Sequence, residues 1–226
     1  TAARVAAGAI AIKLLEEFGI QIHSHVISIG SVHAKPPEKI DWEAVEESPV
    51  RCSDPIAAQK MAAEIDAAVA EAVRNGDDET RPALIFADVA DNPGGGGGGN
   101  TTWILSALHD AGAFGVLLGV FFDPALAREA HKRGEGASFD ATFNAADETE
   151  YSKKFEAPAK VLAISDGECV GRRGLWGGRA LSLGPTALLD LDGRIKVVVV
   201  SNRKQCADPV FFEMFGLDIA EARTVV

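Results

Sequence analysis

Several features that define common protein classes are scarce in this sequence. Only three of its 226 residues are cysteines, and their scattered spacing forms neither a disulfide framework nor a Cys-x-x-Cys metal site. Lysine and arginine total 22 against 33 acidic residues, and the resulting net charge of −11 argues against a nucleic-acid surface. No apolar run approaches the roughly 18–20 residues that span a bilayer. We therefore expect neither a nucleic-acid partner nor a membrane partner.

Targeting signals are also missing from the sequence. The first residues, TAARVAAGAIAIKLLEEFG, are amphipathic but have no basic segment and no cleavage site, so we expect no signal peptide. Together with the few cysteines, this predicts a reducing, cytoplasmic location. The sequence begins with Thr1 inside a helical pattern, which indicates a fragment or a processed piece.

Hydrophobic residues, alanine included, make up 47% of the chain. This is enough for one good core or two small ones. In the first third, their periodicity predicts helices over 2–18, 42–46 and 55–74 and a strictly alternating strand over 20–29. Asp54 is placed to cap the last of these helices. The charged, glycine-containing residues 75–80 then predict a linker, so that the chain divides into segments 1–74 and 81–226.

Beyond residue 80, strands and helices alternate. The patterns predict strands over 83–89, 115–122, 137–144, 159–165, 187–191 and 196–201, and helices over 101–111, 123–133 and 209–215. Asp123 and Pro124 form a cap and first turn for the middle helix. This order predicts an α/β fold that becomes α+β towards the C-terminus, with a mixed sheet and flanking helices.

The most informative stretch is PALIFADVADNPGGGGGGNTTWILSALHD, in which six glycines join a strand to a helix. Glycines let backbone N–H groups converge, and a helix start adds unpaired donors, so this loop suits an anion. No Lys-Ser/Thr follows the glycines, which excludes a Walker-type phosphate loop. The candidate substrate- or anion-binding residues are Asp91, Asn92, Gly94, Gly95, Gly96, Asn100 and Thr101. Two alternatives remain: a flexible turn without ligand, or a turn in which Asp91 itself caps backbone N–H groups.

Other candidate residues carry weaker signals. His23 and His25 share one face of the expected strand, but no further zinc ligand stands nearby, so we expect a polar pair and no metal. The segment GECVGRRGLWGGRAL is compatible with an anion clamp, but it more strongly predicts a glycine-rich hairpin with basic tips. Cys206 follows a strand and has Arg203 and Lys204 beside it, which would lower its pKa, but no base partner is visible.

The segments TAARVAAGAIAIKLLEEFGI, HSHVISIG and ESPVRCSDP, with a helix ending AEIDAA, resemble chorismate synthase from residue 1 to about 68. That family forms chorismate from 5-enolpyruvylshikimate 3-phosphate on reduced FMN. The resemblance covers only an interior slice, and most flavin contacts of the family lie outside it. None of the five histidines (His23, His25, His33, His109 and His131) stands in a matching catalytic motif.

From about residue 81 to 226 the chain resembles the C-terminal domain of the microcystinase C (MlrC-like) family of zinc metallopeptidases. The residues RPALIFADVADNPGGG, NTTWILSALHDAGAFG and LGPTALLDLDGRIKVVVVSNRKQCADPVFFEMFGLD carry this likeness. The family's zinc ligands belong to its N-terminal domain, so the resemblance implies no cofactor in this chain. Residues 97–100 depart from the family's Ala-Pro-Gly-Asp-like stretch, and the chain stops before its Lys-Ser…His-Phe segment.

Three functions follow from these patterns. The resemblance implies one wall of a metallopeptidase or amide-hydrolase cleft, inactive by itself, with a small-molecule or peptide ligand. The alternative is a fragment of chorismate synthase, an FMN-dependent lyase of aromatic amino-acid biosynthesis. The further alternative is a silent chimeric or truncated product.

Overall fold

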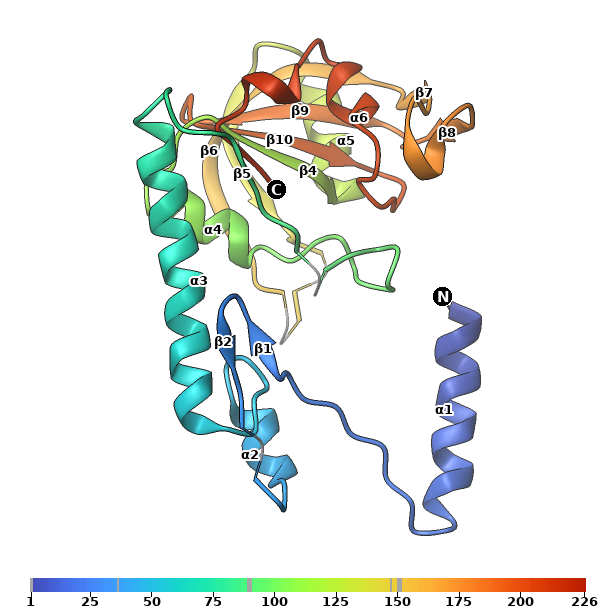
Figure 1. Ribbon diagram of the computed structural model, residues 1–226. Coiled ribbons are helices and arrows are strands. Elements are labelled where there is room, and N and C mark those ends of the chain that lie inside the picture. Colours follow the sequence, from blue (N-terminus) through green and yellow to red (C-terminus); the bar gives the residue numbers. More distant parts are fainter. Residues whose placement is uncertain (1, 36, 89–90, 147, 150–151) are drawn as a thin grey trace. The chain divides into compact units, whose positions relative to one another are not determined.

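The computed structural model describes residues 2–35, 37–88, 91–146, 148–149 and 152–226 (Figure 1). It divides into two compact units, Thr1–Ala70 and Glu71–Val226. The division falls within a long helix, α3 (Pro55–Gly76). Each unit is described here by itself.

The first unit is mainly helical and has a small core. Its other elements are α1 (Ala2–Glu16), β1 (Ser28–Ile29), β2 (Val32–His33) and α2 (Trp42–Glu47). Its buried cluster consists of Cys52, Ala57, Ala58 and Met61. Asp54 caps α3 as expected, because its Oδ1 atom accepts the N–H groups of Ile56 and Ala57, both at 3.0 Å.

The strand predicted over residues 20–29 is wrong for most of its length. Only Ser28 and Ile29 form a strand, which pairs antiparallel with β2, and residues 20–27 have no regular structure. The alternating pattern predicts a pleated surface, but a strand also needs a neighbour for its backbone groups. The N–H of Val26 donates to the carbonyl of Arg51 at 2.8 Å and the carbonyl of Ile27 accepts the N–H of Ala34 at 2.9 Å, but these isolated bonds do not form a strand ladder over residues 20–27. The isoleucines Ile20, Ile22 and Ile27 are therefore exposed.

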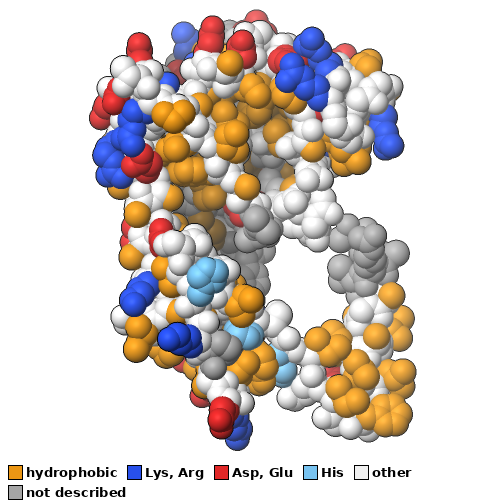
Figure 2. Space-filling model, in the orientation of Figure 1, with side chains coloured by type: hydrophobic (Ala, Val, Ile, Leu, Met, Phe, Trp, Pro, Cys, Tyr) orange, Lys and Arg blue, Asp and Glu red, His pale blue; other side chains and the backbone are white. Residues whose placement is uncertain are grey.

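The helix α1 confirms the first predicted helix, but it buries little of its apolar surface. Ile10, Leu14 and Phe18, just beyond its end, are 73%, 61% and 73% exposed. Figure 2 shows these hydrophobic side chains gathered along the helix and the turn that follows. The first unit therefore contains a regular helix whose apolar surface lacks a partner among the described residues.

The second unit is built on a seven-stranded mixed sheet with the order β3-β11-β4-β10-β9-β6-β5. The strands are β3 (Leu84–Ile85), β4 (Val116–Phe122), β5 (Ser138–Phe143), β6 (Phe155–Ser165), β9 (Thr186–Leu191), β10 (Ile195–Val200) and β11 (Thr224–Val225). The first four in this order run parallel to one another, and the others pair antiparallel. The predicted α/β layer that turns into α+β is confirmed.

The helices of this unit begin and end close to the predicted positions. They are α4 (Trp103–Asp110), α5 (Pro124–Arg133) and α6 (Val210–Glu213). Asp123 caps α5, because its Oδ1 atom accepts the N–H groups of Ala125 and Leu126 at 3.1 and 2.9 Å. Because α5 contacts β5, β6, β9 and β10, it covers one face of the antiparallel half of the sheet.

The strand β11 was missed by the sequence patterns, and it changes the order of the sheet. It lies between β3 and β4, with Thr224 paired to both Leu84 and Val116. A two-residue strand has no periodicity to detect. The predicted strand 83–89 shortens to β3, and its last residue lies outside the described residues.

One buried cluster lies between this sheet and the C-terminal helical segment. It includes Leu117, Leu188, Val198, Phe211 and Phe212, all of them buried. The bulky aromatic side chains of α6 are packed against the sheet close to β4. This packing fixes the chain that follows β10 above the carboxyl ends of the parallel strands.

Candidate functional site

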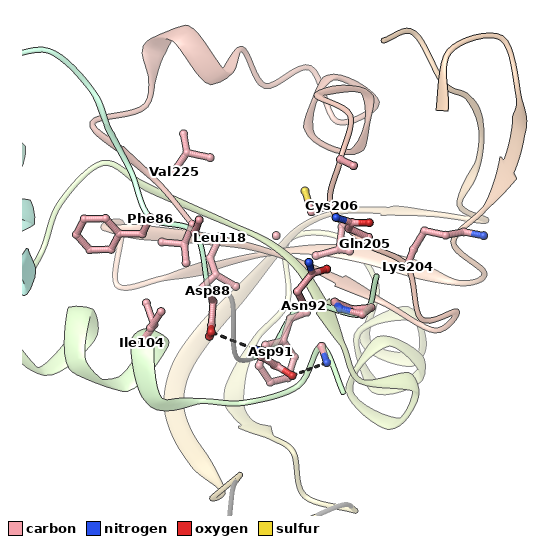
Figure 3. A pocket seen from close by; sticks show the side chains of 18 of the residues that line it. Phe86, Asp88, Asp91, Asn92, Ile104, Leu118, Lys204, Gln205, Cys206 and Val225 are labelled. Atoms are coloured by element: carbon pink, nitrogen blue, oxygen red, sulfur yellow. Dashed lines mark hydrogen bonds between the residues drawn. The ribbon is translucent and has the colours of Figure 1, made fainter. Parts of the chain in front are cut away.

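A cavity of about 460 Å³ lies where the parallel strands end. The cavity is lined by residues 86–88 and 91–93, which follow β3, by residues 204–209, which follow β10, and by the end of β11. In open α/β sheets this edge is where ligands bind. The apolar part of the lining includes Phe86, Ile104, Leu118, Phe212 and Val225 (Figure 3).

The carboxylate of Asp91 binds backbone N–H groups at the end of the glycine loop. Its Oδ1 atom accepts the N–H of Gly99 at 2.7 Å, and its Oδ2 atom accepts the N–H of Thr101 at 2.6 Å. Asp88 in turn accepts the N–H of Asp91 at 3.1 Å. The loop therefore contains a carboxylate of its own at the position where a bound anion was expected.

The remaining loop donors are also directed at nearby residues. Asn92 accepts the N–H of Gly94 through Oδ1 and those of Gly95 and Gly97 through its carbonyl, each at 2.9 Å. Gly96 has φ of 110°, which glycine adopts without strain. This geometry favours the interpretation in which Asp91 and Asn92 bind backbone N–H groups. The anion site stays a prediction.

The predicted site residues divide into two groups in space. Asp91, Asn92 and Thr101 line the cavity, whereas Gly94, Gly95, Gly96 and Asn100 do not. Asn100 instead donates from Nδ2 to Oδ1 of Asn144 at 2.9 Å, and its carbonyl accepts the hydroxyl of Ser152. Asn100 thus ties the loop to the far end of β5.

Gln205 is a cavity residue that the sequence did not single out. It follows β10 and lines the cavity opposite the end of β3. A Cβ atom added at Gly94 would come within 2.6 Å of Cδ of Gln205 and 3.1 Å of Oδ1 of Asn92. Both carboxamides therefore lie close to Gly94. The chain that follows β10 therefore approaches the glycine loop.

The pKa of Cys206 is raised, and the expectation that Arg203 and Lys204 lower it is wrong. Although part of Cys206 is exposed, the protein atoms around its sulfur desolvate this cavity-lining thiol and raise its pKa, and the charge of Asp208 raises it further. The two cations are directed at aromatic rings, with Arg203 4.7 Å from the centre of Phe122 and Lys204 5.5 Å from Trp176. A protonated thiol is a poor nucleophile, so this geometry does not support covalent catalysis by Cys206.

The segment around Arg172 and Arg173 forms the expected hairpin, with β7 (Glu168–Val170) antiparallel to β8 (Ala180–Ser182). The buried carboxylate of Asp208 accepts the backbone N–H groups of Arg172 and Arg173 at 2.6 and 2.8 Å. The guanidinium of Arg172 pairs with Glu213 at 2.6 Å. These contacts hold the hairpin against the chain that follows β10, and an anion clamp is not favoured.

The two histidines of the first unit contact an aromatic ring. His23 stacks on Trp42 at 4.4 Å between ring centres, and His25 meets the edge of the same ring at 5.9 Å. Nowhere in the described residues do three or more His, Cys, Asp or Glu side chains form a group able to hold a metal ion. The described residues therefore do not fit a zinc centre.

Each helix in the described part of the chain is too short or too polar to cross a bilayer.

Comparison with known proteins gives different relatives for the two ends of the chain. Residues 1–77 match the family model for chorismate synthase. Curated chorismate synthases from Symbiobacterium thermophilum and Bacillus subtilis are 51% and 49% identical over 72 and 81 residues, or 30% and 34% of this chain. These matches cover 18% and 20% of the relatives, so the chain spans about a fifth of their length.

The remainder of the chain matches a second family. A solved structure from Mesorhizobium sp. BNC1, named as a metallopeptidase, matches 70% of this chain with a TM-score of 0.59 and 22% identity. The match covers 31% of that structure and shows a shared fold. Residues 86–226, more than half of the chain, match the model for the MlrC C-terminus, and the chain therefore belongs to that family.

Proposed function

We propose that residues 81–226 form one wall of the substrate cleft of an MlrC-type metallopeptidase or amide hydrolase. The observation that carries this proposal is the cavity at the carboxyl ends of parallel strands, within a sequence of the MlrC C-terminus family. Its largely apolar lining with a few polar groups is typical of a small-molecule or peptide site. Asp91 shapes the wall, and Asn92 and Thr101 face the ligand.

The wall acts without a metal of its own. The family implies zinc, but the described residues offer no donor set for it, so no hydrolytic step is assigned to them. What these residues do is hold an amide-containing ligand and exclude water from its apolar part. Hydrolysis would require metal ligands from outside the described residues. By this proposal, the chain binds its ligand and leaves it intact.

The proposal includes a division of the chain and a location. We place the segment resembling chorismate synthase at 1–74, a linker at 75–80 and the MlrC-like domain at 81–226. The low cysteine content supports a reducing, cytoplasmic location. The net charge of −11 supports a ligand other than nucleic acid.

The test combines metal analysis with peptide binding. The purified chain is incubated with zinc and dialysed, and we expect no stoichiometric zinc to remain. Linear and cyclic peptides with apolar residues should be retained on the immobilised chain and recovered uncleaved. Stoichiometric zinc that is lost on His23→Ala or His25→Ala, together with hydrolysis, would show a metal centre in the chain itself. Failure to retain any peptide would contradict the proposal that residues 81–226 form a wall of the substrate cleft.

A second candidate is supported by about 50% identity to curated chorismate synthases over the first third of the chain. This would make residues 1–74 part of a flavin-dependent lyase. Most flavin contacts of that family lie outside the segment that the resemblance covers. We expect no retention of reduced FMN on gel filtration. Tight binding of FMN would place this candidate first.

A further inference from the structure

The cavity has an apolar side and a polar side. Figure 3 shows Phe86, Ile104 and Leu118 on one side and the carboxamides of Asn92 and Gln205 towards the other. Its volume of about 460 Å³ lies within the roughly 300–1,000 Å³ of small-molecule sites. The cavity is therefore large enough for an apolar side chain with an attached polar group.

The charged groups around the cavity already have partners. Asp91 binds two loop N–H groups, and Asp208 binds those of Arg172, Arg173 and Val210. Asp88 accepts the N–H of Asp91, and the Lys204 ammonium lies over Trp176. An anionic ligand would lose its hydration beside the carboxylates of Asp88, Asp91 and Asp208, and a cationic ligand would have to compete with the N–H groups that these carboxylates bind, so burying either charge is costly.

The neutral groups have unused hydrogen-bonding capacity. In the part of the chain that the structure describes, no hydrogen bond is made by Nδ2 of Asn92 or by the side-chain carboxamide of Gln205. Each primary amide has two N–H donors and a carbonyl acceptor. An amide group of a ligand presents one donor and one acceptor, which such a pair can match.

We propose that this cavity is a specificity site for an uncharged amide attached to a bulky apolar side chain, and that Gln205 and Asn92 recognise the amide. The inference rests on the proposed function and narrows it. It selects residues internal to a peptide, or with blocked ends, over residues with a free carboxylate or ammonium group. Gly94 is required because a larger residue there would displace the Gln205 carboxamide.

Three probes that share the phenylalanine side chain test this inference. They are N-acetyl-L-phenylalanine N-methylamide, which is uncharged, N-acetyl-L-phenylalanine, which is anionic, and L-phenylalanine N-methylamide, which is cationic. Calorimetry on the full chain should show the uncharged probe binding about tenfold more tightly than either charged probe, because a carboxylate end would face acidic side chains and an ammonium end would compete with the N–H groups that these side chains bind. Equal or tighter binding of a charged probe would overturn the inference.

Variants then test the two carboxamides. Gln205→Ala should weaken the uncharged probe about five- to tenfold, the loss of roughly one hydrogen bond. The control Gln59→Ala removes the same group from an exposed position on α3 and should change nothing. Gly94→Ala should weaken binding as Gln205→Ala does, whereas Gly8→Ala, where a Cβ meets no atom within 4 Å, should not.

A variant that changes which probe is preferred distinguishes loss of a contact from misfolding, because a misfolded chain would bind no probe. Gln205→Glu keeps the shape of the side chain but adds a negative charge, so its preference should move to the cationic probe. Unchanged preference in a folded Gln205→Glu variant would overturn the inference. If the single-residue amide binds but longer peptides do not, the proposed function fails and this inference stands. If peptides bind and the three probes are not distinguished, the proposed function stands and this inference fails.

Discussion

The two units of this chain contrast in how they use apolar residues. The unit Glu71–Val226 buries large side chains such as Phe143, Phe211 and Leu189 completely. The unit Thr1–Ala70 buries mostly small ones, while Ile10, Phe18 and other large apolar side chains are exposed. Hydrophobic content alone does not make a core, because burial depends on complementary surfaces.

The relatives explain this contrast. The N-terminal match covers about a fifth of the length of the curated chorismate synthases, so in those relatives the matching segment is part of a much longer chain. The MlrC C-terminus match, by contrast, covers every strand of the sheet of the second unit except β3 at its edge. The unit that forms the seven-stranded sheet can bury its own apolar face, whereas the unit with only two short paired strands leaves a helix face exposed.

Limited proteolysis should give the largest difference between the units. We expect chymotrypsin to cut in residues 18–27 about a hundredfold faster than in β4 or β10, because exposed, irregular backbone opens at almost no free-energy cost. Residues 75–80 should last longer, since Arg223 donates hydrogen bonds to the carbonyls of Asn75, Asp78 and Arg81. Mass spectrometry identifies the fragments. Earlier digestion of the C-terminal part would contradict the contrast.

Matched phenylalanine variants should separate the units by stability. Phe211→Ala empties a fully buried site and should lower the free energy of unfolding by about 3–5 kcal/mol. Phe18→Ala, at a side chain that is 73% exposed, should change it by less than about 0.5 kcal/mol. Urea unfolding followed by circular dichroism measures both. Similar losses for the two variants would show that Phe18 is packed in solution.

The two helix caps give a smaller contrast. Asp123 caps α5 and also accepts the N–H of Asn144 at 2.8 Å from a buried position, so Asp123→Ala should cost about 2 kcal/mol. Asp54→Ala should cost less, because water replaces its contacts. Asp123→Asn and Asp54→Asn keep a capping oxygen and serve as controls in the same thermal unfolding series. A larger loss for Asp54→Ala would contradict the contrast.

The acid response should show the smallest effect. Burial alone would raise the pKa of Asp208, but the N–H groups of Arg173, Val210 and Arg172 outweigh it and hold the pKa below 3.8. A lowered folded pKa contributes stability above pH 3.8, and this stability is lost as the pH falls through the folded pKa. The melting temperature should therefore fall less between pH 6 and pH 2.5 for Asp208→Asn than for the unsubstituted chain. An unchanged slope would show that Asp208 does not contribute.

Local patterns were sufficient for much of the second unit. The apolar runs of β4, β9 and β10 and the Asp123–Pro124 start of α5 appear in the structure nearly as predicted. Each is specified within a few residues, by continuous burial or by a capping side chain. The strand-to-helix character of the glycine segment and the contribution of Asp91 as a backbone acceptor were also within reach of the sequence.

What the sequence by itself determined is thus the set of local elements and the mixed character of the sheet. Tertiary structure decided which elements have partners: β11 enters between β3 and β4, whereas residues 20–27 form no strand despite perfect alternation. It also decided that Gln205 meets Asn92 beside Gly94. The physical reason is that periodicity reports which side a residue would bury, but pairing depends on segments more than a hundred residues away.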